Sequence, residues 1–276
     1  MRWYVVAIYV FLYLPIALIV VFSFNAGRYA MDWQGFSTEW YFKAFANPFA
    51  MKALRTSLVV ALWTAVLATT LGTLAELGLE RMQGWPRRAF DALIYVAIMV
   101  PGVVIGIATL IAFVTVFDAV NPFLAGLFGD AAPQLAMGLP TIIGAHVLFN
   151  LAVVILIVRA RFAGLDRSLI EASEDLYATP FGTFRQVVLP MIFPAILASF
   201  LLSFTFSFED FIIAFFVSGP DSTLPIYIFS SIRRGITPEV NAIGTVVLAA
   251  SLSLLVIAQF LLRDRNARRP APDKAA

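Results

Sequence analysis

The chain alternates between long apolar stretches and shorter polar segments. Six stretches lack Asp, Glu, Lys and Arg over roughly 20 residues or more, the length that an α-helix needs to cross a bilayer. Backbone polar groups in lipid must pair within the protein, so these stretches predict six transmembrane helices. The expected spans lie at about residues 3–27, 56–77, 91–117, 139–158, 190–217 and 240–262. The sequence therefore predicts an all-α membrane protein, with residues 1–276 as a single transmembrane domain.

The composition supports a membrane protein and excludes several kinds of active site. Hydrophobic residues make up 61% of the chain and charged residues 13%, whereas soluble domains carry about a quarter charged residues. The lack of cysteine excludes disulfides, thiol nucleophiles and Cys-based zinc sites, and a single histidine excludes a His-rich metal site. No G-x-x-x-x-G-K-[ST] motif is present, so ATP hydrolysis would have to occur on another chain. We expect no catalytic residue, metal or cofactor here.

The basic residues predict the orientation of the spans. Lys and Arg are enriched on the cytoplasmic side of membrane proteins. With the N-terminus inside, 13 of the 19 basic residues are also inside: Arg2, Arg81, Arg87, Arg88, Arg159, Arg161, Arg167, Arg185, Arg263, Arg265, Arg268, Arg269 and Lys274. Both termini are therefore expected to be cytoplasmic. Arg233 and Arg234 fall on the outer side, against this rule.

Polar and helix-breaking residues mark the third and fourth spans. Pro101 removes a backbone donor and Gly102 adds freedom, so a kink is expected in the third span. The kink could line a transport path or accommodate packing. His146 and Asn150 lie four residues apart on one helix face, which favours a hydrogen bond to a neighbouring helix over a ligand role.

The segment 159–190 is the longest polar stretch that the predicted orientation places inside. Ser168 and Glu171 have capping-box spacing, which predicts a helix to about Leu176. Thr179 and Pro180 predict the start of a second helix. A linker between spans would not need the apolar residues of this segment in water. Exposed apolar residues next to charges instead favour a docking surface.

The stretch "EASEDLYATPFGTFRQVVLP" resembles the EAA loop of permease subunits of binding-protein-dependent ABC importers. Glu171, Ala172, Ser173, Leu189 and Pro190 are in register with the family pattern, and Val187 replaces an Ile. Tyr177 stands where the family usually has Gly, so the tight turn there is in question. The resemblance implies a MetI-like permease architecture with six transmembrane helices. It also implies an ATPase-coupling role for Glu171, Ala172, Ser173, Asp175, Leu176, Tyr177 and Gly182.

The fifth and sixth spans resemble the spermidine/putrescine branch of these permeases. The similar stretches are the acidic pair Glu209–Asp210, Ser218–Pro220, Leu224–Pro225 and Gly235–Ala242. The resemblance implies a polyamine permease of the bacterial inner membrane. Its implied partners are a second permease subunit forming a heterodimer, two ATPase subunits and a periplasmic binding protein. The alternatives are a permease for ferric iron, an opine, a phosphonate or an amino-acid derivative, and a self-sufficient channel or secondary carrier.

The acidic pair is the main candidate for contact with a transported solute. A charge at mid-bilayer costs roughly 2.5–3.5 kcal/mol on insertion scales, so Glu209 and Asp210 should face protein or water. On a continuous helix Asp210 lies on a stripe of serines, and Glu209 lies about 100° away from it. Asp210 is thus the stronger path candidate, and a structural polar contact is the alternative. The candidate path residues are Asp210, Glu209, Ser207, Ser203, Asp118 and Trp40, of which Trp40 could instead be an interface anchor.

Overall fold

The computed structural model describes residues 2–29, 32–166, 168–235 and 237–266. Within these ranges the regular structure is helical, apart from an isolated bridge between Asn25 and Phe36. The chain forms two compact units, Met1–Met51 with Tyr227–Ala276, and Lys52–Ile226, and each is described by itself. The expected all-α fold class is confirmed.

Five helices of the described ranges are long and apolar enough to cross a membrane. They are Trp3–Phe22 in α1 (Arg2–Phe22), α3 (Pro48–Glu80), α5 (Gly102–Phe128), α6 (Leu139–Ala163) and the continuous run Pro180–Glu209. Helix α12 (Pro238–Asn266) coincides with the sixth expected span, but the side chains of residues 254, 255 and 257–266 lie outside the description. The count of six spans and the cytoplasmic termini stay predictions.

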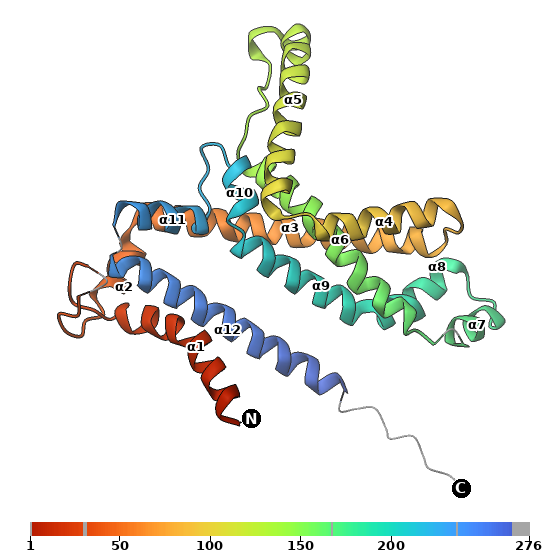
Figure 1. Cartoon of the computed structure of the whole chain (residues 1–276). Coiled ribbons are helices and arrows are strands. Elements are labelled where there is room, and N and C mark those ends of the chain that lie inside the picture. The colour runs from red at the N-terminus through yellow and green to blue at the C-terminus, as the bar shows by residue number, and fades with distance from the viewer. Residues whose placement is uncertain (1, 30–31, 167, 236, 267–276) are drawn as a thin grey trace. The chain divides into compact units, whose positions relative to one another are not determined.

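The third expected span is two helices rather than one kinked helix. Helix α4 (Trp85–Met99) ends before Val100, which has the extended angles φ −68° and ψ 127°. Pro101 is also extended, and α5 begins at Gly102. Proline disfavours helical angles at the residue before it, which explains the break. Figure 1 shows that the chain changes direction sharply between α4 and α5, so residues 91–117 do not form one kinked helix, and the bounds of the third span stay a prediction.

The fifth expected span is also broken, at the acidic pair. Helix α9 (Leu189–Glu209) ends at Glu209, and Asp210 is extended with φ −67° and ψ 123°. The short helix α10 (Ile212–Val217) follows. The prediction of one helix over 190–217 is therefore wrong. Helix α9 is joined to α8 (Pro180–Thr183) by a π-helical turn, η2 (Phe184–Val188), and Pro190 lies in the first turn of α9.

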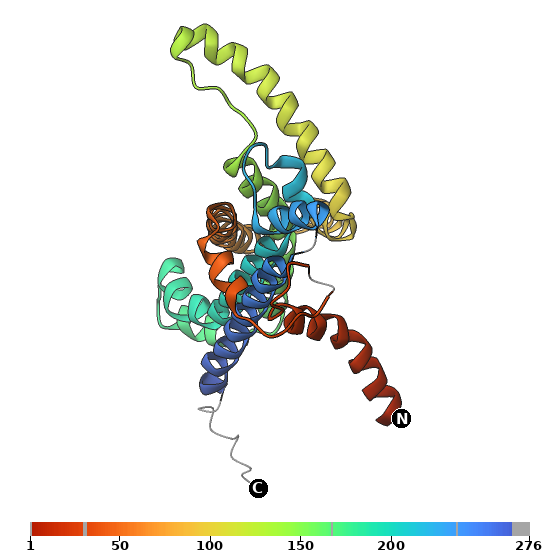
Figure 2. The same ribbon diagram turned by 90° about the vertical axis from the view of Figure 1, so that its left-hand side faces the viewer.

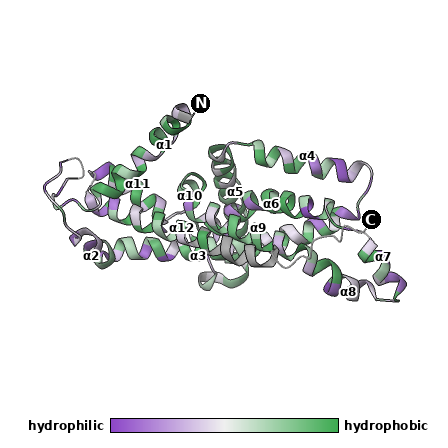
Figure 3. Ribbon diagram, turned by 90° about the horizontal axis from the view of Figure 1, so that it is seen from below, coloured by the Kyte–Doolittle hydropathy of each residue, from purple (hydrophilic) through white to green (hydrophobic). Residues whose placement is uncertain are grey.

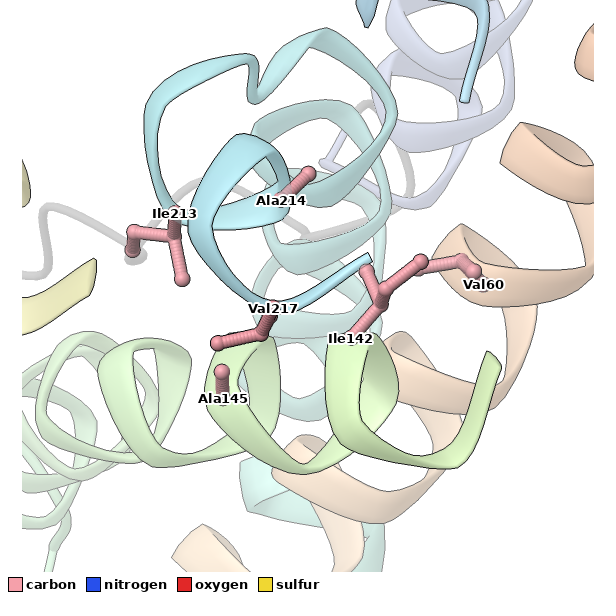
Figure 4. Packing of buried hydrophobic residues seen from close by; sticks show 6 residues of the cluster. All are labelled: Val60, Ile142, Ala145, Ile213, Ala214 and Val217. Carbon is pink, nitrogen blue, oxygen red and sulfur yellow. The ribbon is translucent and has the colours of Figure 1, made fainter. Parts of the chain in front are cut away.

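Helix α10 is held by the core of the larger unit. Its apolar face joins residues of α6 and α3 in a buried cluster, shown in Figure 4 and formed by Val60, Ile142, Ala145, Ile213, Ala214 and Val217. Helix α5 also packs against α10, where a Cβ on Gly106 would come within 2.6 Å of the Phe216 ring. In Figure 2, α5 extends away from this packed region. The broken fifth span is thus fixed between α5 and α6.

The smaller unit contains α1, α2 (Glu39–Ala46), most of α11 (Leu224–Arg234) and α12. The hydroxyls of Ser23 and Tyr41 lie 2.6 Å apart, and Asn47 donates to Tyr227 and Glu239. No residue of Trp3–Phe22 in α1 is buried, and Figure 3 shows this helix as largely hydrophobic. This surface suits contact with lipid or another apolar chain, since large exposed apolar patches are uncommon in soluble monomers.

Candidate translocation site

Asp210 lies at the break between α9 and α10, in contact with both α10 and α6. Its Oδ2 accepts a hydrogen bond of 3.0 Å from the backbone N–H of Ala214 in the first turn of α10. The same oxygen lies 3.2 Å from Nε2 of His146 on α6, within ion-pair distance but without hydrogen-bond alignment. The Asp210 carboxylate therefore helps to end one helix and to begin the next.

His146 connects the Asp210 carboxylate to α9. Its Nδ1 lies 2.8 Å from the Ser207 hydroxyl, and both side chains are buried. If the neutral ring accepts from Ser207 at Nδ1, its proton is on Nε2 and faces Asp210. The expected hydrogen bond from His146 to a neighbouring helix is thus present. We call Asp210, His146 and Ser207 the carboxylate cluster.

One oxygen of the Asp210 carboxylate remains available. The Ala214 amide and the His146 ring both contact Oδ2, and no described residue donates a hydrogen bond to Oδ1. The side chain is 23% exposed, so it is neither sealed in the core nor open to solvent. A partly buried carboxylate with a fixed orientation and a free oxygen is suited to hold a cationic group.

Below the carboxylate cluster, the α6–α9 interface is lined by small and polar side chains. Asn150 donates 2.8 Å to the His146 carbonyl. Its Oδ1 and the hydroxyls of Ser199 and Ser203 are buried without a hydrogen-bond partner among the described residues. Buried polar atoms are usually paired, so these three unpaired atoms are unusual. They make part of the contact between two otherwise apolar helices polar. The predicted serine stripe on α9 is present, and it faces α6.

The end of α9 adds to the negative potential near Asp210. The last four carbonyls of a helix have no partner within the helix, and the helix dipole places partial negative charge at that end. In α9 this end coincides with Glu209, which is exposed. The helix end, Glu209 and Asp210 together favour a cation over an anion.

Two candidate path residues are not joined to the carboxylate cluster. Asp118 is exposed on α5, and the described contacts of the carboxylate cluster do not include it. Trp40 belongs to the other unit, where the Lys43 ammonium lies 4.4 Å from the centre of its ring. That ring face already carries a cation, which weakens Trp40 as a site for a second one.

The segment between α6 and α9 forms two short helices with a tight turn between them. Helix α7 (Ser168–Asp175) is followed by hydrogen bonds from Tyr177 N to Glu174 O and from Ala178 N to Ser173 O. These two bonds define a Schellman turn, whose residue in the left-handed region is usually glycine. Here it is Tyr177, with φ +57°. The tight turn expected at this position is therefore present, although Tyr177 replaces the usual glycine.

The caps of these helices differ in part from expectation. Ser168 does not cap α7 but is its first residue. Hydrogen bonds from its hydroxyl and from its backbone N–H lower the pKa of the Asp166 carboxyl. Residue 167, which precedes α7, lies outside the described residues. Thr179 caps α8 as predicted and accepts from the Gly182 N–H. The Ser173 and Thr183 hydroxyls lie 3.0 Å apart and link α7 to α8.

Apolar side chains are exposed around the Schellman turn. Leu176 is 82% exposed, Tyr177 95% and Phe181 71%. Glu171, Ala172 and Asp175 of α7 are exposed as well, and Ser173 and Gly182 are half-buried. The loop thus presents a compact apolar patch bordered by acidic residues, which we call the loop patch.

Comparison with known proteins agrees with the sequence and the fold. The family described as "Binding-protein-dependent transport system inner membrane component" matches residues 68–269. The spermidine/putrescine transport system permease protein PotC of Escherichia coli (strain K12) is 34% identical over 95% of this chain and 94% of its own length. The putrescine transport system permease protein PotI of the same organism is 37% identical over 95% of this chain and 90% of its own length.

A solved structure extends the comparison to the fold. A chain of a bacterial ABC transporter involved in the import of the acidic polysaccharide alginate superposes with a TM-score of 0.74 at 14% identity. The match covers 94% of this chain and 92% of that chain. The expected ABC importer permease architecture is confirmed. The chain belongs to the family of binding-protein-dependent transport system inner membrane components.

Proposed function

We propose that this chain is the permease subunit of an ABC importer that carries polyamines such as spermidine and putrescine across the bacterial inner membrane. The relatives named for these solutes support the substrate class. The observation that carries the proposal is the Asp210 carboxylate, held through one oxygen at a helix break inside the membrane domain. Broken helices and unpaired backbone at membrane depth are typical of transport sites.

The chemistry around Asp210 fits an alkyl chain with ammonium groups. Asp210, Glu209 and the α9 C-terminus supply negative charge. Phe206 is partly exposed and lies near Phe149, with ring centres 6.4 Å apart. Aromatic faces contact both the ammonium and the methylene groups of such a solute. An anionic solute would be repelled by the same groups.

The loop patch is the proposed contact with an ATPase subunit. Leu176, Tyr177 and Phe181 would be covered in that interface, and the acidic border would contact basic residues of the partner. In this scheme ATP is hydrolysed on two separate ATPase subunits, because this chain carries no phosphate-binding loop. A second permease subunit would complete the path, and a periplasmic binding protein would deliver the solute.

The proposal is tested by uptake in proteoliposomes that contain the complete complex and its binding protein. Labelled putrescine should be taken up only when ATP is present on the side of the membrane that carries the ATPase subunits. Unlabelled spermidine should compete with this uptake. A dicarboxylic acid of similar length serves as the matched control and should neither enter nor compete. A complex that hydrolyses ATP with its binding protein but takes up no polyamine would contradict the proposed substrate.

A further inference from the structure

A second polar cluster lies away from the carboxylate cluster, where α3, α4 and α6 meet. Glu76 on α3 is fully buried. Arg159 on α6 binds it with two hydrogen bonds, Nε to Oε1 at 3.0 Å and Nη2 to Oε2 at 2.9 Å. This fork-to-carboxylate pairing fixes both the distance and the orientation of the two side chains.

Helix α4 joins the same cluster through two charged residues. Arg159 Nη1 lies 2.8 Å from Asp91 Oδ1 as an ion-pair contact, and Arg87 Nε lies 3.3 Å from the same oxygen. Arg87 Nη2 lies 3.5 Å from Glu76 Oε1, and Arg87 also donates to the Leu79 carbonyl. Two acidic and two basic residues therefore balance one another. We call Glu76, Arg87, Asp91 and Arg159 the ion cluster.

Stability alone gives a weak reason for the ion cluster. The desolvation of buried ions offsets most of their attraction, and apolar replacements are often equally stable. The same helices are already packed through Leu79, Ile94, Ala152 and Ile155. The ion cluster instead fixes how the three helices are arranged, because the Arg159 guanidinium can pair with Glu76 and Asp91 only when the helices are correctly placed.

The position of the ion cluster relates it to the loop patch. Arg159 lies one turn before Ala163, where α6 ends and the loop begins. Arg161 donates 2.8 Å to the Met191 carbonyl at the start of α9, where the loop ends. Both ends of the loop are thus attached, through α6, to the helices of the larger unit.

We propose that the ion cluster is a positioning element that makes α3, α4 and the end of α6 move as one body when the loop moves. This inference rests on the proposed transport function, because the loop would receive its movement from the ATPase. Without the ion cluster the loop still binds its partner, but its displacement is not passed to α3 and α4.

The first test compares Glu76→Gln with wild type in the reconstituted complex. The substitution keeps the shape of the side chain and removes its charge. We expect normal ATP hydrolysis, but a ratio of putrescine uptake to ATP hydrolysed that is lower by roughly tenfold, within the range shown by coupled contacting residues. Arg88→Gln is the matched control, because Arg88 is the exposed neighbour of Arg87 on α4. An unchanged ratio in assembled Glu76→Gln complex overturns the proposal.

A double variant separates positioning from stability. Glu76→Gln leaves Arg159 with an unbalanced charge and can reduce assembly, whereas Glu76→Gln with Arg159→Gln removes both charges. We expect the double variant to recover assembly but not the uptake-to-ATP ratio. Recovery of both would mean that the ion cluster only supports folding, and it would overturn the proposal.

A distance measurement does not depend on the solute. Because the chain has no cysteine, Arg88→Cys on α4 and Ala163→Cys at the end of α6 would give it two unique sites for spin labels. In the assembled complex the distance distribution should be the same with and without ATP, and it should change with ATP when Glu76→Gln is added. A distance that changes with ATP in the labelled protein without Glu76→Gln, or that stays constant in both, contradicts the proposal. If no putrescine enters wild-type vesicles, the proposed substrate fails and this measurement alone decides.

Discussion

At the residue scale, Asp210 and Glu209 differ in the way their surroundings hold them. Asp210 is fixed by the Ala214 amide and His146, whereas Glu209 is an exposed residue at the end of α9. Two neighbours in sequence therefore have different expected roles. The fixed carboxylate should determine binding, and the exposed one should contribute only to the local potential.

Asp210→Asn is expected to lower the apparent affinity for putrescine by about tenfold to a hundredfold, because a charge-assisted contact contributes about 1.5–3 kcal/mol. The amide oxygen can still accept from Ala214, so the level of assembled complex should not change. Concentration-dependent uptake, normalised to assembled complex, gives the measurement. Glu209→Gln is the control and should have the smaller effect. Wild-type affinity in Asp210→Asn would remove Asp210 from the binding role.

Tyr177 is a second residue whose conformation predicts an effect. A non-glycine residue in the left-handed region costs about 1–2 kcal/mol, and the Tyr177 side chain is too exposed to offset this by packing. Part of the gain from Tyr177→Gly is lost to the greater freedom of glycine in the unfolded chain, about 0.5–1 kcal/mol. Thermal unfolding of the purified complex should therefore show equal or higher stability.

The same variant separates fold from contact. If Tyr177 contacts an ATPase subunit, Tyr177→Gly should weaken co-purification of that subunit while stability is maintained. Loss of stability would show that the ring packs within the protein. Unchanged co-purification would show that the glycine turn, and not the tyrosine ring, is what the partner needs.

At the element scale, the α7–α8 segment combines a rigid backbone with an exposed apolar surface. Its caps, its Schellman turn and the Ser173–Thr183 contact fix the backbone. Leu176 next to this turn is 82% exposed, so a polar replacement should not disturb the fold. Substitutions on this surface can therefore test contact with an ATPase subunit without changing the stability of the fold.

Leu176→Asp should uncouple ATP hydrolysis from transport, because the contact would bury a carboxylate in place of an apolar side chain. Uptake in vesicles is expected to fall, with normal amounts of the chain in the membrane. The same substitution in the α3–α4 loop, Gln83→Asp, is the control and should transport normally. Wild-type uptake by Leu176→Asp would place the ATPase contact elsewhere.

The sequence predicted where helices lie better than it predicted where they are broken. The long apolar runs identified α1, α3 and α6, because burial in lipid requires length and hydrophobicity whatever the neighbours are. Pro101 was interpreted as a kink, but the extended Val100 ends α4 completely. The helix through Glu209 and Asp210 was assumed to be continuous, and nothing local in that sequence signals the break. At the break Asp210 accepts from the nearby Ala214 N–H, and it also lies beside His146 of α6, a tertiary contact that the local sequence does not reveal.

The candidate site was predicted in part for the same reason. The stripe of serines follows from helical spacing, and it is buried against α6 as expected for polar residues in a span. The contact between Asp210 and His146 joins residues far apart in sequence, which spacing cannot reveal. The ion cluster was missed because Glu76, Arg87, Asp91 and Arg159 lie at the edges of expected spans, where charges usually face water.

At the scale of the whole molecule, long helices expose apolar side chains that the chain itself does not cover. Only 11% of the apolar part of α5 is buried, and none of the apolar part of α1. Lipid or a second permease subunit would have to cover these helices. The isolated chain is therefore expected to need detergent or its partners to remain in solution.

The orientation of the chain is a prediction at this scale. With both termini inside, a phosphatase that is active only in the periplasm should be inactive when fused after Ala276, and active when inserted at Gln134 in the loop between α5 and α6. A pair of cytoplasmic reporters at the same positions should give the opposite result. Phosphatase activity at Ala276 would reverse the orientation and move the loop patch to the outer side.

The close approach of Gly106 to Phe216 has a consequence for the history of the family. One methyl group at Gly106 would overlap the Phe216 ring, so α5 and α10 could not keep their spacing. Substitutions at these two positions are therefore expected to be correlated during divergence. Relatives with alanine in place of Gly106 should carry a smaller side chain in place of Phe216, and relatives that keep the glycine should be free to keep the ring. An alignment in which the two positions vary independently would show that the two helices can separate at little cost.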